Sequence, residues 1–198
     1  MCARFPRQTV PIEGKGRCIV GKAGRYFILL MELSFWGWAV ETVFFFCCYG
    51  RFFDRGFMTL PFCTIYGCSF LLVDLLVGEE NPSGGWAAAG YVLVCAAVPT
   101  ALELVTGIFF HRVFGLRLWS YDAYRFHLNG YICLEYALLW GALVPACMRY
   151  VVAPMKRRVF SLPKKTAAVA ALVLLSLALT DWTVNFFRQQ VALPGFLR

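Results

Sequence analysis

Carboxylates inside apolar runs are the residues of this chain best placed to do chemistry. Six of the eleven acidic residues lie in stretches without lysine or arginine, namely Glu32, Glu41, Asp74, Glu103, Glu135 and Asp181. A charged side chain in hydrocarbon costs about 2.5–3.5 kcal/mol even on the lenient insertion scale, so such residues face a protein interior or a wet cavity. There they can bind a solute or a proton, or hold helices together as ion pairs. For Glu41 and Glu103 both roles stay open.

Arginines, aromatic residues and a histidine accompany these acids. The planar guanidinium of arginine suits an anionic headgroup or a substrate carboxylate, although Arg51 and Arg55 can equally extend to lipid headgroups. His127 is either a proton acceptor near neutral pH or a hydrogen-bonded structural residue. No catalytic residue is assigned. We expect the substrate-binding residues among Glu41, Arg51, Arg55, Tyr66, Glu103, Arg117, Trp119, Tyr121, Asp122, His127, Asn129 and Glu135.

The composition is typical of a membrane protein. The 198 residues are 60% hydrophobic and 15% charged, with a mean hydropathy of +0.65, whereas a soluble domain is about 45–50% apolar. A net charge of +8 would suggest nucleic acid in a soluble protein. Here it is typical of the cytoplasmic side of a membrane protein. We expect membrane lipids as partners and no nucleic acid.

The sequence predicts neither a metal nor a cofactor. Seven of the nine cysteines fall in or beside apolar runs and no CxxC occurs, so they are interpreted as small packing residues. Residues 16–23, GRCIVGKA, approach the phosphate loop GxxxxGK[ST], but Ala23 lacks the hydroxyl that would reach magnesium. If ATP drives this protein, a separate subunit must hydrolyse it.

Five apolar segments can position these residues, because about 20 helical residues cross a bilayer. They lie near 26–49, 59–78, 86–110, 130–151 and 166–187, and they predict an all-α membrane bundle of about five transmembrane helices. The second opens with Pro61, so its start can be a short re-entrant or broken piece. The domains are then a basic cytoplasmic segment at 1–25, a single transmembrane bundle at 26–187 and a short tail at 188–198.

Basic residues orient the chain. They cluster before the first segment and in the fourth connection, at Lys156, Arg157, Arg158, Lys164 and Lys165. Placing both clusters inside follows the positive-inside bias and predicts a multi-pass protein of the cell membrane with a cytoplasmic N-terminus. The connections at 50–58 and 111–129 then lie outside, the second along the interface. The acids of the outer half, near the arginines of these connections, are Glu41, Glu103, Glu135 and Asp181.

Two patterns concern how the segments pack. Helical spacing places Pro99, Glu103, Thr106 and Gly107 on one inward face of the third segment. A weak duplication is also visible, because a glutamate, a loop with arginine and aromatic residues, and a returning helix that opens with Pro or Gly occur twice, at 41–61 and 103–130. A parallel repeat would place both loops about a common axis. Shared membrane composition is the alternative explanation.

Several motifs occur in one order along residues 36–141. They are WGWAVET at 36–42, GRFFDRGF at 50–57, PFCTIYG at 61–67, GLRLWSYD at 115–122, FHLNGYICLEY at 126–136 and WG at 140–141. Together they resemble the small bacterial membrane-protein family called Putative ABC-transporter type IV, or ABC transporter permease. Its pattern has GW-x-x-E, GR-x-x-x-RGF, PFCPIYG, G-x-RLWDYS and FNL-x-GRICL-x-YSLxWG. This chain departs from that pattern at Thr64, Ser120, Asp122, His127 and Tyr131.

The resemblance implies a permease-like function. A polar site near the outer face, lined by glutamate and arginine, would handle a small or amphiphilic solute. A separate ATPase or another membrane subunit is then a candidate partner, as is a second copy of the chain. The alternatives are an intramembrane enzyme acting on a lipid or lipid-linked substrate, and a non-catalytic subunit of a membrane complex. No serine, cysteine or histidine arrangement in the sequence indicates a nucleophile with its base.

Overall fold

The protein is a helical membrane bundle with one very short hairpin. This computed structural model describes the backbone of residues 15–51, 57–78, 82 and 84–196, and the surroundings of the side chains among them from 21 to 188. The elements are α1 (Lys15–Tyr49), α2 (Thr64–Val77), α3 (Gly85–Phe114), β1 (His127–Leu128), β2 (Ile132–Cys133), α4 (Leu134–Cys147), the π-helical turn η1 (Met148–Val152), α5 (Ala153–Ser161) and α6 (Lys164–Phe196).

Four helical stretches are long and apolar enough to cross a membrane. In the described part of the chain they are Gly21–Tyr49, Gly85–Phe114, Leu134–Ser161 and Lys164–Arg188. The second predicted segment is different, because α2 has only 14 residues. At 1.5 Å per residue it covers about 21 Å, which is less than the roughly 30 Å of hydrocarbon. Its helix begins at Thr64, three residues after Pro61, at the place where the sequence predicts a broken start.

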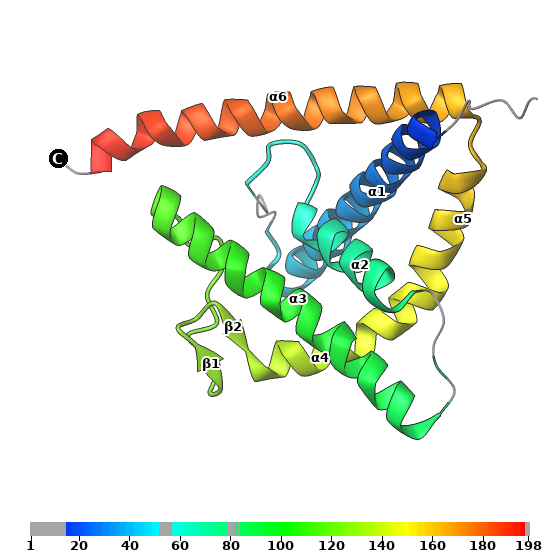
Figure 1. Cartoon of the computed structure of the whole chain (residues 1–198). Coiled ribbons are helices and arrows are strands. Elements are labelled where there is room, and N and C mark those ends of the chain that lie inside the picture. Colours follow the sequence, from blue (N-terminus) through cyan, green and yellow to red (C-terminus); the bar gives the residue numbers. More distant parts are fainter. Residues whose placement is uncertain (1–14, 52–56, 79–81, 83, 197–198) are drawn as a thin grey trace, which may run out of the picture.

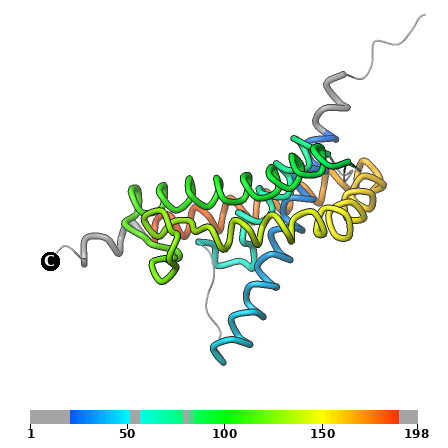
Figure 2. The backbone as a smooth tube through the Cα atoms, turned by 90° about the horizontal axis from the view of Figure 1, so that it is seen from below, coloured from blue at the N-terminus to red at the C-terminus, as the bar shows by residue number. Residues whose placement is uncertain are grey.

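The helices pack around α2. It contacts both α1 and α3, and α4 lies along α3, while α6 lies mainly against α1. Figure 1 shows α3 inclined to α6, and in the view from below α1 crosses α3, α4 and α6 obliquely (Figure 2). One buried cluster joins α1, α2, α3, α4 and η1, and it consists of Leu29, Leu33, Val73, Tyr91, Cys95, Val144, Met148 and Val152.

Every fourth residue of α3 from Tyr91 to Gly107 is buried. This stripe consists of Tyr91, Cys95, Pro99, Glu103 and Gly107. The predicted inward face is therefore confirmed for Pro99, Glu103 and Gly107, and Thr106 is half-buried beside them. The stripe holds one carboxylate, so α3 carries Glu103 into the interior of the bundle.

Small residues bring α1 and α2 into close contact. A Cβ atom on Gly37 would lie 2.5 Å from the Cβ atom of Tyr66, and one on Gly67 would collide with the Ser34 hydroxyl and the Leu30 carbonyl oxygen. The Ser34 hydroxyl itself donates to the Leu30 carbonyl over 2.7 Å, so its polar group needs no partner on α2. These contacts fix Tyr66 against the middle of α1.

The fourth predicted connection is mostly helical. The sequence predicts a helix that ends near 151 and a basic loop after it, but α4, η1 and α5 form one continuous helical stretch to Ser161. The prediction was wrong because Pro154 does not end the helix. Its ring would clash with the carbonyl of residue 150, four positions earlier, and the π turn at 148–152 widens the backbone at that point.

This continuation pairs the two acids at the α5 end of the bundle. Lys156 donates to both carboxylate oxygens of Asp74 over 2.9 Å, and the Asp74 side chain is 1% exposed. Arg158 pairs with Glu32 over 2.7 Å at a more exposed position. Both acids that the sequence assigns to the inner half of the membrane are thus neutralised by basic residues of α5.

Candidate functional site

The segment between α3 and α4 folds as a compact hairpin around one arginine. Arg117 donates through Nη1 to Asp122 over 2.7 Å and through Nη2 to the Asn129 carbonyl over 2.6 Å. Its guanidinium also lies 5.7 Å from the ring centre of Tyr131. Asn129 and Gly130 have positive φ angles of 49° and 70°, and a Cβ atom on Gly130 would collide with Asp122. Glycine is therefore required at that turn.

His127 belongs to this hairpin as a structural residue. It lies on β1, which pairs antiparallel with β2, and its Nδ1 accepts the Gly130 N–H over 3.0 Å. In this geometry Nδ1 serves as a hydrogen-bond acceptor, and it also lies 3.9 Å from Oδ1 of Asp122. The geometry agrees with the structural interpretation of His127.

The surroundings of two hairpin residues shift their pKa values. The Ser120 hydroxyl, followed by Arg117, holds the pKa of the Asp122 carboxyl below its ordinary value. The pKa of Tyr121 is raised far above its ordinary value, first by burial and then by the nearby charge of Glu103. Tyr121 therefore stays protonated and serves as a hydrogen-bond donor.

Glu103 is the point where the hairpin and the bundle meet. Its side chain is on α3 and the residue is only 8% exposed. The Tyr121 hydroxyl donates to Oε1 over 3.3 Å, and the indole N–H of Trp140 on α4 donates to the same oxygen over 3.2 Å. Among the described residues no lysine, arginine or histidine pairs with this carboxylate.

Further aromatic rings pack against the two donors of this carboxylate and against the next turn of α3. Tyr66 on α2 packs edge-on against Trp140, with ring centres 6.0 Å apart and planes at 72°. Tyr121 packs against Tyr136 of α4, with ring centres 4.8 Å apart. Trp119 donates through Nε1 to the Tyr131 carbonyl over 2.9 Å. Both Trp119 and Tyr131 lie against Gly107, one turn beyond Glu103, where a side chain would obstruct Tyr131.

Glu41 adds a second carboxylate to the same region. It is half-buried on α1, and its charge acts on both Glu103 and Tyr66. Since like charges at close range oppose each other, the two glutamates cannot be treated as independent groups. The site therefore draws on α1, α2, α3, α4 and the hairpin, and we call it the Glu103 site, consisting of Glu41, Tyr66, Glu103, Tyr121, Tyr136 and Trp140.

The structure divides the predicted site residues into groups. It brings Glu41, Tyr66, Glu103 and Tyr121 together in the Glu103 site. The hairpin holds Arg117, Trp119, Asp122, His127 and Asn129. Glu135 is exposed in the first turn of α4 and Arg51 is exposed just after α1. Arg55 lies outside the described residues.

Sequence reasoning missed Trp140 and Tyr136 as members of the site. Trp140 has the appearance of an interfacial anchor, and only its position in the WG motif marks it out. The sequence places the arginines of the outer connections near the outer acids, but Arg117 pairs with Asp122, which is not one of those acids, and no described arginine pairs with Glu103. A further predicted outer acid, Asp181 on α6, accepts the backbone N–H of Thr59 over 3.0 Å instead.

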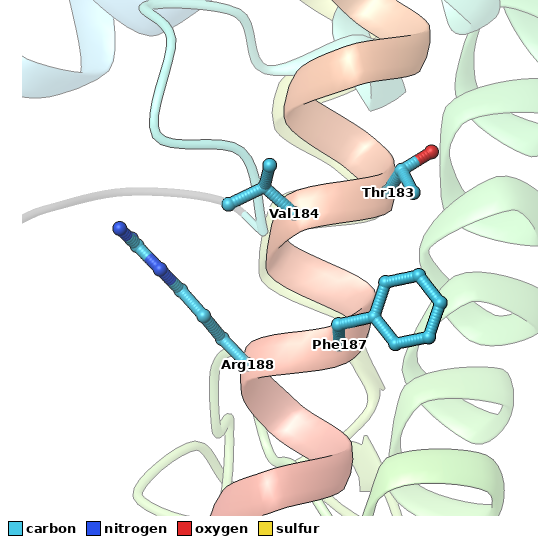
Figure 3. Close-up of a pocket in the computed structure, with 4 residues that line it drawn as sticks. All are labelled: Thr183, Val184, Phe187 and Arg188. Atoms are coloured by element: carbon cyan, nitrogen blue, oxygen red, sulfur yellow. The ribbon is translucent and has the colours of Figure 1, made fainter.

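A separate hollow lies on the surface of α6. It is lined by Thr183, Val184, Phe187 and Arg188, and Figure 3 shows Val184 and Arg188 on one side of the helix and Phe187 on the other. A single helix supplies all four residues, and none of them belongs to the Glu103 site. This hollow therefore has no convergent polar groups of the kind that fix a ligand.

Comparison with known proteins bears on the family. A family model described as Putative ABC-transporter type IV matches residues 26–186. The matched range contains every residue of the Glu103 site and the whole hairpin. Searches of curated proteins and of solved structures found no match.

Proposed function

The chain belongs to the Putative ABC-transporter type IV family, and from this premise we propose that it is a permease-like membrane protein that binds a small or amphiphilic solute at the Glu103 site. The site lies toward the hairpin end of the bundle, which the positive-inside bias assigns to the outer face. Its lining differs from the one the sequence predicts. Among the described residues, the hydrogen-bond partners of Glu103 are the aromatic side chains of Tyr121 and Trp140.

The observation that carries this proposal is the burial of Glu103 with no basic partner among the described residues. An unpaired charge in low dielectric costs several kcal/mol, so a purely structural acid would be expected to have a cation beside it. Asp74 in the same bundle has one, at 2.9 Å. Glu103 is held by two neutral donors instead, which orient its carboxylate without neutralising it. A carboxylate kept in this way is suited to a ligand or a proton.

The number of elements at the site supports a role in transport. Tyr121 comes from the hairpin, Trp140 from α4 and Tyr66 from α2, while α1 and α3 supply the glutamates. A shift of α3, of α4 or of the hairpin would change the hydrogen bonds of Glu103. Solute binding at such a junction can therefore be coupled to helix movement, which alternating access requires.

A membrane-complex partner such as an ATPase is part of the proposal. The family description suggests one. We assign its contact to the α5 end, where exposed basic residues such as Arg157 and Lys164 lie. Affinity purification from native membranes should recover an ATPase in fixed stoichiometry, and the double substitution Arg157→Glu and Lys164→Glu should weaken that recovery.

The substitutions Glu103→Gln and Glu41→Gln test the proposed function. Each preserves side-chain size and removes a charge, so membrane insertion should be unaffected while solute handling is lost. A thermal-shift screen of the purified protein against small solutes would identify ligands, and uptake of those ligands into proteoliposomes would measure transport. Glu32→Gln, which alters an acid at the opposite end, is the control and should retain activity. Full uptake by both site variants would show that the acids are structural.

A further inference from the structure

We propose that the Glu103 site selects an organic ammonium cation. This inference rests on the proposed function and names the class of solute. It follows from three properties of the site, namely an uncompensated carboxylate, an aromatic surround, and a poor set of ligands for a metal ion or an anion.

The first property, the lack of a described basic partner for Glu103, becomes clear from comparison with three other acids. Asp74 has Lys156, Glu32 has Arg158 and Asp122 has Arg117 as a partner within 2.9 Å. Among the described residues, Glu103 receives hydrogen bonds from the hydroxyl of Tyr121 and the indole N–H of Trp140. Both bonds end on Oε1, so the lone pairs of Oε2 accept no hydrogen bond from any described residue. A carboxylate offers about four acceptor positions, and a cationic ligand can occupy those that remain.

The second property is the arrangement of the rings. Tyr66 and Trp140 stand nearly perpendicular, at 72°, and form a corner beside Glu103. Tyr121 and Tyr136 form a second pair on the hairpin side. Rings set at steep angles form the walls of the aromatic cages that bind alkylated ammonium groups, because their electron-rich faces attract a cation while their surfaces accommodate its carbon atoms. Trp and Tyr are the strongest contributors.

The third property excludes other ligand classes. Hard divalent cations require about six oxygen ligands, and among the described residues no group of three or more His, Cys, Asp or Glu side chains comes together. An anion would need a basic side chain. The nearest arginine of the hairpin, Arg117, is already bonded to Asp122 and to the Asn129 carbonyl. The Glu103 carboxylate with its aromatic neighbours favours a cation that carries carbon substituents.

Choline and its neutral carbon isostere, 3,3-dimethylbutan-1-ol, provide a direct test. The full chain would be placed in nanodiscs of phosphatidylglycerol, which lack any choline group, and binding would be followed by calorimetry. We expect saturable choline binding and at least about tenfold weaker binding of the isostere, since the two differ only in charge. Equal binding of both molecules, or no choline binding, would overturn the inference.

Matched variants locate the binding. Glu103→Gln and Trp140→Leu should each weaken choline binding about tenfold or more. Tyr121→Phe keeps its ring and should retain most of the affinity. Glu32→Gln should bind as the parent protein does. Monodisperse elution and an unchanged melting temperature would show that a variant is folded. A folded Glu103→Gln variant with unchanged affinity would place the cation elsewhere and refute the assignment.

Two further experiments distinguish a lipid headgroup from a free solute, and this inference from the proposed function. If phosphatidylcholine in the nanodisc competes with free choline, the cation is a lipid headgroup; if it does not, the cation is a free solute. In proteoliposomes, Glu103-dependent uptake of a neutral or anionic solute with no effect of choline would leave the proposed function standing and eliminate this inference. Uptake that is unchanged in the Glu103→Gln variant would eliminate both the proposed function and this inference.

Discussion

Asp74 illustrates how this bundle accommodates a charge in its interior. Lys156 reaches both carboxylate oxygens at 2.9 Å, and the pair lies next to the buried cluster that contains Val73. Removing one member of such a pair leaves the other charged and desolvated, which typically costs about 3–5 kcal/mol. Replacing both members by apolar residues avoids that cost.

We therefore expect Asp74→Asn to lower the free energy of unfolding by about 3 kcal/mol or more. The double variant Asp74→Leu and Lys156→Met should recover most of the loss. Thermal unfolding in detergent measures both effects. Glu32→Gln breaks the more exposed pair with Arg158 and should cost less than about 1 kcal/mol. Equal losses for Asp74→Asn and Glu32→Gln would contradict the importance assigned to burial.

Asp122 allows a prediction about pH. Because the Ser120 hydroxyl and then Arg117 lower its pKa in the folded hairpin, its contribution to stability is complete above the pKa of the unfolded chain, about 3.9. That contribution is lost only as the pH falls below this value through the folded pKa. The contribution of Asp122 should thus be insensitive to pH between about 7 and 5.

Carbon-13 NMR of labelled aspartate measures this pKa directly. Ser120→Ala should raise the pKa of Asp122 toward its ordinary value, and Arg117→Gln should do the same. Thr183→Ala, on the exposed surface of α6, is a control that should leave it unchanged. A pKa unaffected by Ser120→Ala would show that the hydroxyl does not stabilise the charge.

Among the described helices, α1 and α2 approach each other most closely at the glycines Gly37 and Gly67. Gly67→Ala would force a methyl group against the Leu30 carbonyl oxygen, which is backbone and cannot rotate away. Overpacking of this kind costs about 1–3 kcal/mol. We expect a lower melting temperature and weaker solute binding, because Tyr66 lies one residue from this contact. Gly90→Ala on α3 has open space around it and should be neutral or slightly stabilising.

The returning helices α2 and α4 share a detail that bears on the predicted duplication. Each has 14 residues, follows a cysteine at the N-cap position, and carries a tyrosine as its third residue, Tyr66 or Tyr136. Both tyrosines belong to the Glu103 site, and the preceding helices contribute Glu41 and Glu103. The likeness favours duplication, which stays a prediction because similar residues also suit any membrane helix.

Much of the architecture follows from hydropathy, since four long apolar stretches are sufficient to locate the spanning helices. The inward face of α3 follows from helical spacing. The identity of the side chains that reach Glu103 does not follow from helical spacing. Trp140 is 37 residues away, and its partner depends on how α4 lies along α3. The pairing of Asp74 with Lys156 was equally hidden, since it requires a helix that continues through Pro154.

For the molecule as a whole, the hairpin and the α5–α6 turn should lie on opposite sides of the membrane. The described bundle places them at opposite ends of the stretch Leu134–Ser161. In a cysteine-free background, a membrane-impermeant maleimide should label Ser120→Cys in intact cells and should label Ser161→Cys only after lysis. Labelling of Ser161→Cys before lysis, with protection of Ser120→Cys, would reverse the predicted orientation.

The π turn at Met148–Val152 sets the angle about the helix axis between side chains at the two ends of the stretch Leu134–Ser161. Trp140 and Lys156 are 16 positions apart, which in an uninterrupted α-helix corresponds to an angular separation of about 160°. One extra residue accommodated in the π turn reduces that separation to about 60°. Both side chains can then face the bundle from a single helix. Deleting one residue from the turn would leave a regular α-helix with 15 positions between the two side chains, so the same angle would be kept without the π turn. Inserting one residue into the regular part of the helix between them would instead turn Lys156 by about 100° away from Asp74 while leaving Trp140 beside Glu103.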